Sequence, residues 1–162
     1  MDHTSLQYLY QCARVKRWHT HQLPFEQNLA DHSWGVAMII LTMHPNPTVN
    51  LLKAALTHDL QEFELGDWPH TAKEQNPSLG EFEKAYERKF RMEHSIEYEL
   101  EADEQLWLTF ADKLEAFYFL SEIMFLTPRL SEIRIEALTL PRLQVAPFNP
   151  LCIFRHVNKL RW

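Results

Sequence analysis

Glycine is scarce in this chain, with only Gly35, Gly66 and Gly80 among 162 residues. Loops that wrap phosphate groups with backbone amides need several glycines close together. The scarcity therefore excludes a Walker-type or dinucleotide-binding loop. If the protein binds phosphate, side-chain cations and a metal ion must hold it.

Cysteine is also rare, since the chain contains only Cys12 and Cys152. The two residues lie far apart and form no CxxC pair, which argues against a zinc ribbon and against a disulfide scaffold. We expect both to be free thiols that pack as small hydrophobic side chains.

Basic charge and long apolar runs are missing as well. The formal net charge is −6 and the isoelectric point is near 5.8, which disfavours binding to a nucleic acid polymer or to acidic lipid. No run of eighteen apolar residues and no signal sequence is present, so we expect a soluble cytoplasmic protein. Hydrophobic residues make up 46% of the sequence, enough for one globular domain over residues 1–162.

The hydrophobic pattern is helical almost throughout, and no segment alternates convincingly at period two. Leu6, Leu9, Tyr10 and Ala13 fit one face of a first helix. Asn28 is a predicted N-cap, with Asp31 in the first turn, for a helix that ends at Pro45. Further helices are expected from Thr48 or Val49 to near Gly66, and over 78–100, 104–126 and 130–138. The predicted fold is an all-α bundle of about six to seven helices.

His58 and Asp59 stand side by side directly after the apolar segment LLKAAL. Burying them without partners would cost several kcal/mol by typical desolvation estimates, about 3 or more for a charge. A divalent cation shared with other ligands removes that cost. His32 and Asp112 occur in two other apolar helical segments and complete a candidate set. Taken singly, the His58-Asp59 pair and His32 are more typical of ordinary structural residues, and Asp112 is equally compatible with a surface acid. Only the joint pattern favours a metal site.

Two imidazoles and two carboxylates suit Zn²⁺, Co²⁺, Mn²⁺ or Fe²⁺, whereas Mg²⁺ prefers more oxygen ligands and is the remaining candidate. On one continuous helix, His58 and Glu62 would lie four residues apart and share a side. Glu62 is then expected to contact the metal-activated water. Asp67, just past the predicted helix end, is the second candidate for proton transfer.

Four sequence blocks carry a family resemblance. They are Arg17-Trp18 fifteen residues before His32, the run NLADHSWGVA, the run HDLQEFELGDWPHTAK and the weaker block FADKLEAF. Together they resemble the HD-domain phosphohydrolase superfamily, and within it a branch of small nucleotidases that includes phage dATP triphosphohydrolases and bacterial 5′-deoxynucleotidases. The resemblance implies one HD domain with a motif core at about 10–125, followed by a C-terminal helix and tail at 129–162.

The resemblance also implies roles for individual residues. His32, His58, Asp59 and Asp112 would hold the metal, and Glu62 and Asp67 would serve the catalytic step. The implied substrate-binding residues are Arg17 for phosphate, Trp18 for the sugar and base, and Pro69 and Thr20 beside them. Thr20 departs from the apolar residue expected to face the base, which leaves the base preference open. From charge alone, Lys16 and Lys73 are either further phosphate ligands or ordinary surface cations.

The favoured function is therefore a metal-dependent dATP or dNTP triphosphohydrolase. A 5′-deoxynucleotidase that hydrolyses dNMP is the main alternative, and a non-enzymatic nucleotide-binding helical module is the third. The expected partner is a small deoxynucleotide and not a nucleic acid polymer or a membrane. Apolar residues in the tail after Pro141 suggest, in addition, a homo-oligomer.

Overall fold

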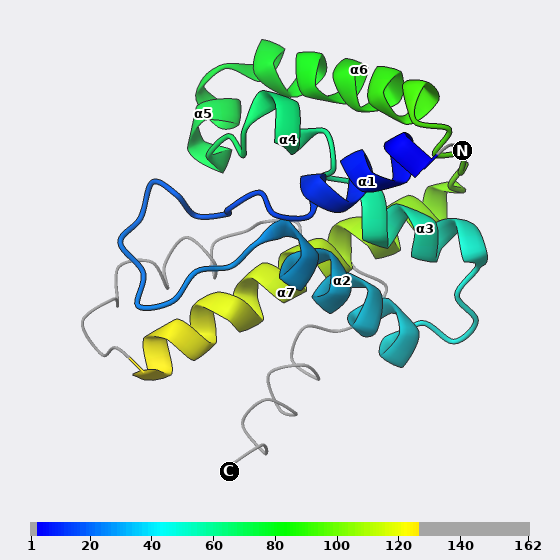
Figure 1. The fold of residues 1–162 in the computed structure, drawn as a ribbon. Helices are drawn as coiled ribbons and strands as arrows, with labels where there is room; N and C mark the ends of the chain where they lie inside the picture. The colour runs from blue at the N-terminus through cyan, green and yellow to red at the C-terminus, as the bar shows by residue number, and fades with distance from the viewer. Residues whose placement is uncertain (1–2, 127–162) are drawn as a thin grey trace.

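The computed structural model describes residues 3–126, and this part of the chain is all-α, as predicted (Figure 1). The predicted C-terminal helix over 130–138 and the tail to residue 162 lie outside the described residues. The helices, in chain order, are α1 (His3–Cys12), α2 (Leu29–Met43), α3 (Val49–Thr57), α4 (Glu62–Leu65), α5 (His70–Gln75), α6 (Pro77–Glu93) and α7 (Ala102–Leu126).

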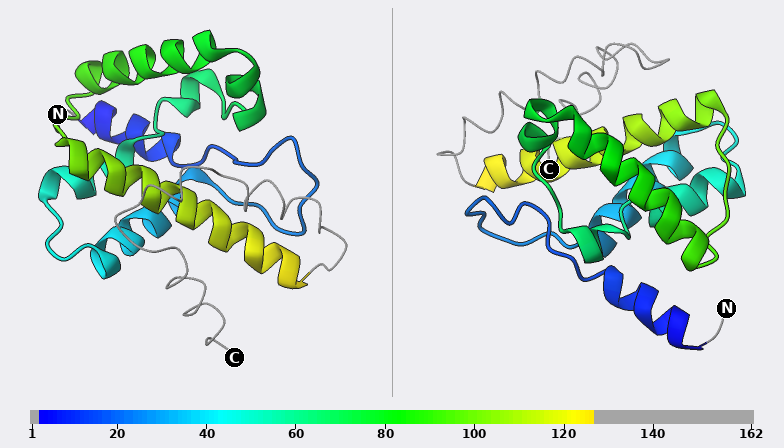
Figure 2. Two further views of the ribbon diagram at one scale, coloured as in Figure 1. Left: turned by 180° about the vertical axis from the view of Figure 1, so that it is seen from behind. Right: turned by 90° about the horizontal axis from the view of Figure 1, so that it is seen from above.

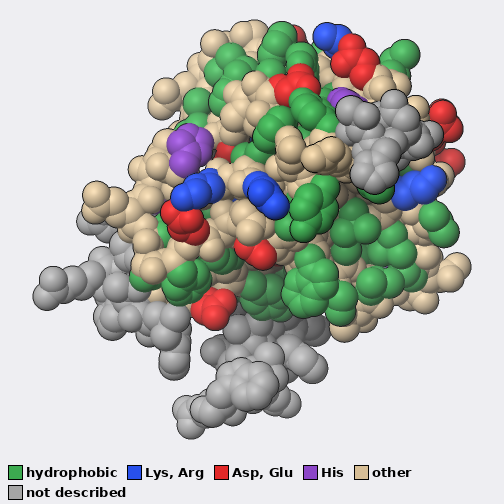
Figure 3. Space-filling model, viewed as in Figure 1, with side chains coloured by type: hydrophobic (Ala, Val, Ile, Leu, Met, Phe, Trp, Pro, Cys, Tyr) green, Lys and Arg blue, Asp and Glu red, His purple; other side chains and the backbone are tan. Residues whose placement is uncertain are grey.

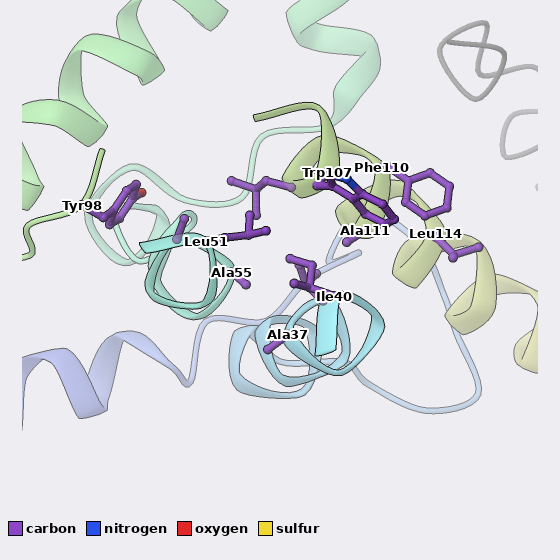
Figure 4. Close-up of a cluster of buried hydrophobic side chains, with 12 residues drawn as sticks. Ala37, Ile40, Leu51, Ala55, Tyr98, Trp107, Phe110, Ala111 and Leu114 are labelled. Atoms are coloured by element: carbon purple, nitrogen blue, oxygen red, sulfur yellow. The ribbon is translucent and has the colours of Figure 1, made fainter. Parts of the chain in front are cut away.

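The main core lies where α2, α3 and α7 meet (Figure 4). Ile40 of α2, Leu51 of α3 and Ala111 of α7 are fully buried in it. Trp107 contributes a large ring to the same cluster and lies edge-on to Phe110, with ring centroids 5.8 Å apart. Helices in contact through apolar faces of this kind form a rigid frame, and the frame fixes the positions of polar residues on the same three helices.

A second apolar cluster joins α1 and α6 to this frame. Its buried members are Cys12, Leu29, Leu60 and Phe90. In the views from the front and from behind, α6 lies along the top of the molecule with α7 beneath it (Figures 1 and 2). Cys12 is buried and unpaired within the described residues, in agreement with its prediction as a small hydrophobic side chain.

The starts of α2 and α3 follow from their local sequence. The Asn28 side chain accepts a hydrogen bond from the Asp31 amide, and the Asp31 side chain accepts one from the Asn28 amide, at 3.0 and 3.2 Å. This reciprocal capping box satisfies two backbone donors and confirms the predicted N-cap. Thr48 caps α3 through a single bond, in which its side chain accepts from the Leu51 amide.

The predicted continuous helix from Val49 to near Gly66 is wrong, because α3 ends at Thr57 and His58 is its C-cap. The Thr57 hydroxyl donates to the Lys53 carbonyl at 2.7 Å, and this bond competes with the helical amide bond and bends helices. The amides of Leu60, Glu62, Phe63 and Glu64 bond three residues back instead of four; the Glu62 amide, for example, donates to the Asp59 carbonyl at 2.9 Å. The segment between α3 and α4 is therefore a tight turn.

The predicted helix over 78–100 also ends early, since α6 stops at Glu93. Ser95 adopts a left-handed φ of 53°, and the Ile96 amide donates to the Arg91 carbonyl at 2.9 Å, which is the hydrogen-bond pattern of a Schellman cap. The Arg91 guanidinium lies 3.4 Å from the centroid of the Tyr98 ring and donates to the Ile96 and Tyr98 carbonyls. These contacts stabilise an irregular segment where the charge pattern predicted helix.

Several large apolar side chains of α2 are exposed, among them Trp34, Met38 and Leu41. In the space-filling view, hydrophobic side chains gather on the lower part of the face, where α2 lies (Figure 3). Among the described helices, none is long and apolar enough to cross a membrane.

Candidate metal centre

The four predicted metal ligands converge from three parts of the fold. His32 comes from the end of the first turn of α2, His58 and Asp59 from the turn after α3, and Asp112 from the middle of α7. Ligand atoms of His32, His58 and Asp59 all lie within 4.8 Å of one another. Asp112 joins them, with its Oδ1 3.3 Å from His32 Nε2. The core packing of α2, α3 and α7 thus brings together residues up to eighty positions apart in the chain. Contacts over such a separation come from tertiary packing and not from local structure.

The orientation of both imidazoles fits a metal ion. His58 Nδ1 lies 3.1 Å from the Ala55 carbonyl, which can only accept, so Nδ1 carries the proton. His32 Nδ1 is hydrogen-bonded to Glu115. The Nε2 atoms of both rings are buried and have no hydrogen-bond partner among the described residues. Two lone pairs in this setting, facing Asp59 at 3.6 and 3.3 Å, are the donor set expected of a divalent metal site.

The charges of this cluster strongly shift its pKa values. Burial opposes protonation of His58, but the negative charge of Asp59, 3.3 Å away, outweighs burial and raises the pKa of His58 to about 9. Burial would raise the pKa of Asp59, yet His58 and Arg17 hold it far below its usual range. For Asp112, burial is likewise outweighed by its contact with His32 at 3.3 Å and by the charge of His58, and its pKa is lowered. In the absence of a cation, protons on the imidazoles therefore balance the carboxylates.

Glu62 lies next to this cluster and is only 4% exposed. Burial, together with the negative charges of Asp59 and Asp67, raises its pKa to about 9. Its Oε2 atom has no hydrogen-bond partner in the part of the chain that the structure describes. A buried carboxyl with a raised pKa and an unused oxygen is suited to exchanging a proton with a nearby water. The turn keeps Glu62 beside Asp59 although the two are not on one helix.

Arg17 contacts the cluster directly. Its Nη1 donates to Asp59 Oδ2 at 2.9 Å, and its side chain is 12% exposed. Burial lowers the pKa of the guanidinium, but the charges of Asp59 and Glu62 outweigh burial and raise it. A guanidinium presents several donors in a planar fork, so Arg17 can hold Asp59 with one nitrogen and still offer others to an anion.

Trp18 and Asp67 are joined by a backbone contact. Trp18 has a left-handed φ of 58°, a conformation that is uncommon for a bulky residue. Its amide donates to Asp67 Oδ2 at 3.2 Å, which ties the loop before α2 to the segment after α4. The Trp18 ring stacks on Phe119 of α7 with centroids 6.2 Å apart.

The remaining predicted substrate residues lie around this core. Lys16 pairs with Glu26 at 2.7 Å, and both side chains are more than half exposed. Lys73 pairs with Glu83 at 2.7 Å in a partly buried position. The positive charge of Lys73 partly opposes the rise in the pKa of Glu62. The hydroxyl of Thr20 contacts an exposed neighbouring histidine. Pro69 is the residue immediately before α5. Lys73 is thus electrostatically coupled to the cluster, and Lys16 makes its ion pair on the surface.

Two buried polar residues were not predicted from the sequence. Glu115, 8% exposed, contacts His32 Nδ1, and Gln27, 3% exposed, donates to Glu115 Oε1 at 2.7 Å. For Glu115 a signal was present, because an acid three residues after Asp112 lies on the same side of α7. No local pattern marks Gln27. Both residues line a surface cleft of about 560 Å³, on the side of His32 that carries Nδ1.

Comparison with known proteins agrees with this geometry. The family model for the HD domain matches residues 11–124. The structure is similar to that of the cyanophage S-2L HD phosphohydrolase DatZ, bound to dA and one catalytic Zn²⁺ ion, with a TM-score of 0.55 and 24% identity over 68% of this chain and 66% of that chain. A conserved hypothetical protein from Pyrococcus furiosus aligns with a TM-score of 0.47 and 23% identity, over 84% of this chain and 99% of that one. No curated protein matches the chain.

The family match spans most of the chain and includes the two histidines and two aspartates of the cluster. The structural similarity extends the agreement to the fold. On this evidence the chain belongs to the HD-domain family.

Proposed function

We propose that this protein is a metal-dependent phosphohydrolase that acts on a free deoxynucleotide. One observation carries the proposal: the buried Nε2 atoms of His32 and His58 lack hydrogen-bond partners within the described chain and face carboxylate oxygens. Together with Asp59 and Asp112, these atoms would hold Zn²⁺, Co²⁺ or Mn²⁺, with Mg²⁺ less suited to the two nitrogens. The phosphohydrolase of similar fold was solved with Zn²⁺.

A divalent ion bound here would lower the pKa of a coordinated water and polarise a phosphoryl oxygen. The positive charge of the bound ion would lower the raised pKa of the neighbouring Glu62, and the ionised Glu62 would then accept the proton of the attacking water. Asp67, whose side chain accepts the Trp18 amide, is the second candidate and would protonate the leaving oxygen. The two carboxyl groups could exchange these roles.

For the substrate, we favour a deoxynucleoside triphosphate. Arg17 would bind phosphate through the guanidinium nitrogens that Asp59 does not occupy. Lys73 lies close enough for its charge to act on Glu62, where it partly opposes the rise in pKa. It would contribute a second positive charge to phosphate binding. Water would attack the α-phosphorus, the bond to O5′ would break, and deoxynucleoside and triphosphate would be released. The Trp18 ring would stack on the base, a contact worth roughly 1–3 kcal/mol.

A 5′-deoxynucleotidase is the alternative, and the pairing of the lysines favours it. Lys16 and Lys73 each pair with a glutamate at 2.7 Å, which reduces the charge available for two further phosphates. A dNMP would need only the guanidinium of Arg17. A non-enzymatic nucleotide-binding module is the third alternative. The buried Glu62 argues against it, because a module that only binds nucleotide has no need of a buried carboxyl group suited to proton transfer.

Incubating the protein with dATP or dAMP in the presence of Co²⁺ or Mn²⁺, and resolving the products by ion-exchange chromatography, separates these alternatives. Deoxyadenosine with triphosphate supports the favoured function, and deoxyadenosine with phosphate from dAMP alone supports the nucleotidase. No turnover with any of the four dNTPs or dNMPs contradicts both. The Asp59→Asn variant is the control that should abolish either reaction.

A further inference from the structure

A chain of hydrogen bonds runs from the loop before α2 to the candidate metal ligand His32. Trp18 Nε1 donates to Gln27 Oε1 at 2.9 Å, and Gln27 Nε2 donates to Glu115 Oε1 at 2.7 Å. The other Glu115 oxygen is hydrogen-bonded to His32 Nδ1. His32, Gln27 and Glu115 are all less than 9% exposed, so water does not readily replace any of these bonds.

The direction of every bond in this chain is fixed by its first donor. An indole N–H can donate but cannot accept, so Gln27 must turn its oxygen toward Trp18 and its NH₂ group toward Glu115. Glu115 therefore receives a donor at Oε1. Its other oxygen is then available to accept from His32, which places the imidazole proton on Nδ1 and the lone pair on Nε2. That nitrogen is the atom that faces Asp59 and Asp112.

We propose that Glu115 is a positioning residue of the metal centre: it orients the His32 ring and selects its metal-binding tautomer, and Gln27 and Trp18 hold Glu115 in the accepting state. The inference rests on the proposed metal site but needs no particular substrate. Carboxylates that accept from the second nitrogen of a metal-binding histidine raise the basicity of the ligand and fix its ring. Asp112 and Glu115 lie three residues apart on α7, so one helix face supplies both a ligand and its support.

Gly35 provides the space for this carboxylate. It lies in α2, three residues after His32, and a Cβ atom added there would approach Glu115 Cγ to 2.7 Å and Oε1 to 3.3 Å. A methyl group at position 35 would displace the Glu115 side chain from its partners. Gly80, in α6, has open space around its Cα. Glycine is therefore sterically required at position 35 and not at position 80. Substitutions at these two helical glycines form a matched pair for experiment.

The first test is Co²⁺ affinity, measured by titration without nucleotide, for Glu115→Gln and for Glu122→Gln. An amide at position 115 can accept only one of the two incoming donors, so we expect Glu115→Gln to weaken Co²⁺ binding by about 10–100-fold. Glu122 is exposed two turns further along α7, and its variant should bind like the wild type. Glu115→Gln protein that binds Co²⁺ within about threefold of the wild type would overturn the proposal.

The second test uses suppression. In Trp18→Phe the indole donor is lost and the stacking ring is kept, so Gln27 is free to turn its amide around. In the double variant Trp18→Phe/Glu115→Gln, Gln27 could accept from the new amide, whose oxygen could then accept from His32. We expect the double variant to recover most of the Co²⁺ affinity that Glu115→Gln loses. A double variant that binds no better than Glu115→Gln alone would contradict the proposed direction of the hydrogen-bond chain.

The third test decides the case if Glu115→Gln does not fold. Gly35→Ala adds a residue of higher helix propensity, and its folded state is checked by thermal unfolding of the metal-free protein. We expect Co²⁺ affinity to fall by about tenfold in Gly35→Ala and to stay at the wild-type value in Gly80→Ala. Equal affinities in the two variants would overturn the role of Glu115. Wild-type protein that binds no Co²⁺ would overturn the proposed function as well, whereas binding without hydrolysis would overturn only the proposed function.

Discussion

The metal-free protein should lose stability as pH rises from about 6.5 to about 9. His58 has a pKa of about 9 in the folded chain, against about 6.5 in an unfolded one. Below pH 6.5 both states carry the proton, and the full stabilisation is present. Between the two values the unfolded chain releases its proton while the folded one retains it, so the free energy of unfolding falls.

The size of the effect follows from the same two values. A difference of about 2.5 pKa units corresponds to about 3 kcal/mol at most. Glu62, whose pKa is also raised to about 9, acts in the same direction, because an acid with a raised pKa destabilises the fold once the unfolded chain ionises. A fall of this size is a large part of the stability of an ordinary domain, roughly 5–15 kcal/mol.

Urea unfolding of chelator-treated protein at several pH values between 6 and 9 measures this slope. Because Co²⁺ displaces the His58 proton, the stabilisation gained on adding Co²⁺ should increase over the same range. His58→Gln should flatten the slope of the metal-free protein. A free energy of unfolding that stays constant or increases between pH 6.5 and 9 would refute the electrostatic account of the cluster.

Three further predictions concern single residues. Arg17→Met should destabilise the metal-free protein by about 3 kcal/mol in urea unfolding, because it leaves the partly buried Asp59 without its guanidinium partner. The control Lys16→Met, which breaks an exposed pair, should cost less than about 1 kcal/mol. Equal costs in the two variants would contradict the claim that burial makes the Arg17–Asp59 pair the stronger one. Asn28→Ala should lower the free energy of unfolding by about 1 kcal/mol through loss of the capping box, and an unchanged value would show that the box contributes nothing. Glu62→Gln should keep Co²⁺ affinity but lower turnover by about 100-fold or more, and a full rate would remove Glu62 from the mechanism.

The helix starts and the ligand set could be read from the sequence because each depends on local chemistry. Asn28 caps its own helix with Asp31 three residues on. His32, His58 and Asp112 stand out because polar residues in apolar segments need partners. Packing of α2, α3 and α7 then brings them together, which the sequence predicted only through their joint occurrence and the family resemblance.

The helix ends and the support of the metal centre could not be read in this way. α3 ends at Thr57, after which backbone amides bond three residues back, and α6 ends at Glu93, where Arg91 donates to the carbonyls of Ile96 and Tyr98. Neither contact has a strong sequence pattern. Glu115 depends on Gln27, which lies 88 residues earlier in the chain, and a contact of that range follows only from the tertiary fold.

The central claim is that His32, His58, Asp59 and Asp112 share one divalent ion, and a Co²⁺ titration followed by visible absorption tests it most directly. We expect the wild type to bind one Co²⁺ per chain with a spectrum typical of mixed nitrogen and oxygen ligands. His58→Ala and Asp112→Ala should each weaken binding by about tenfold or more. Wild-type stoichiometry and affinity in both variants would contradict the claim.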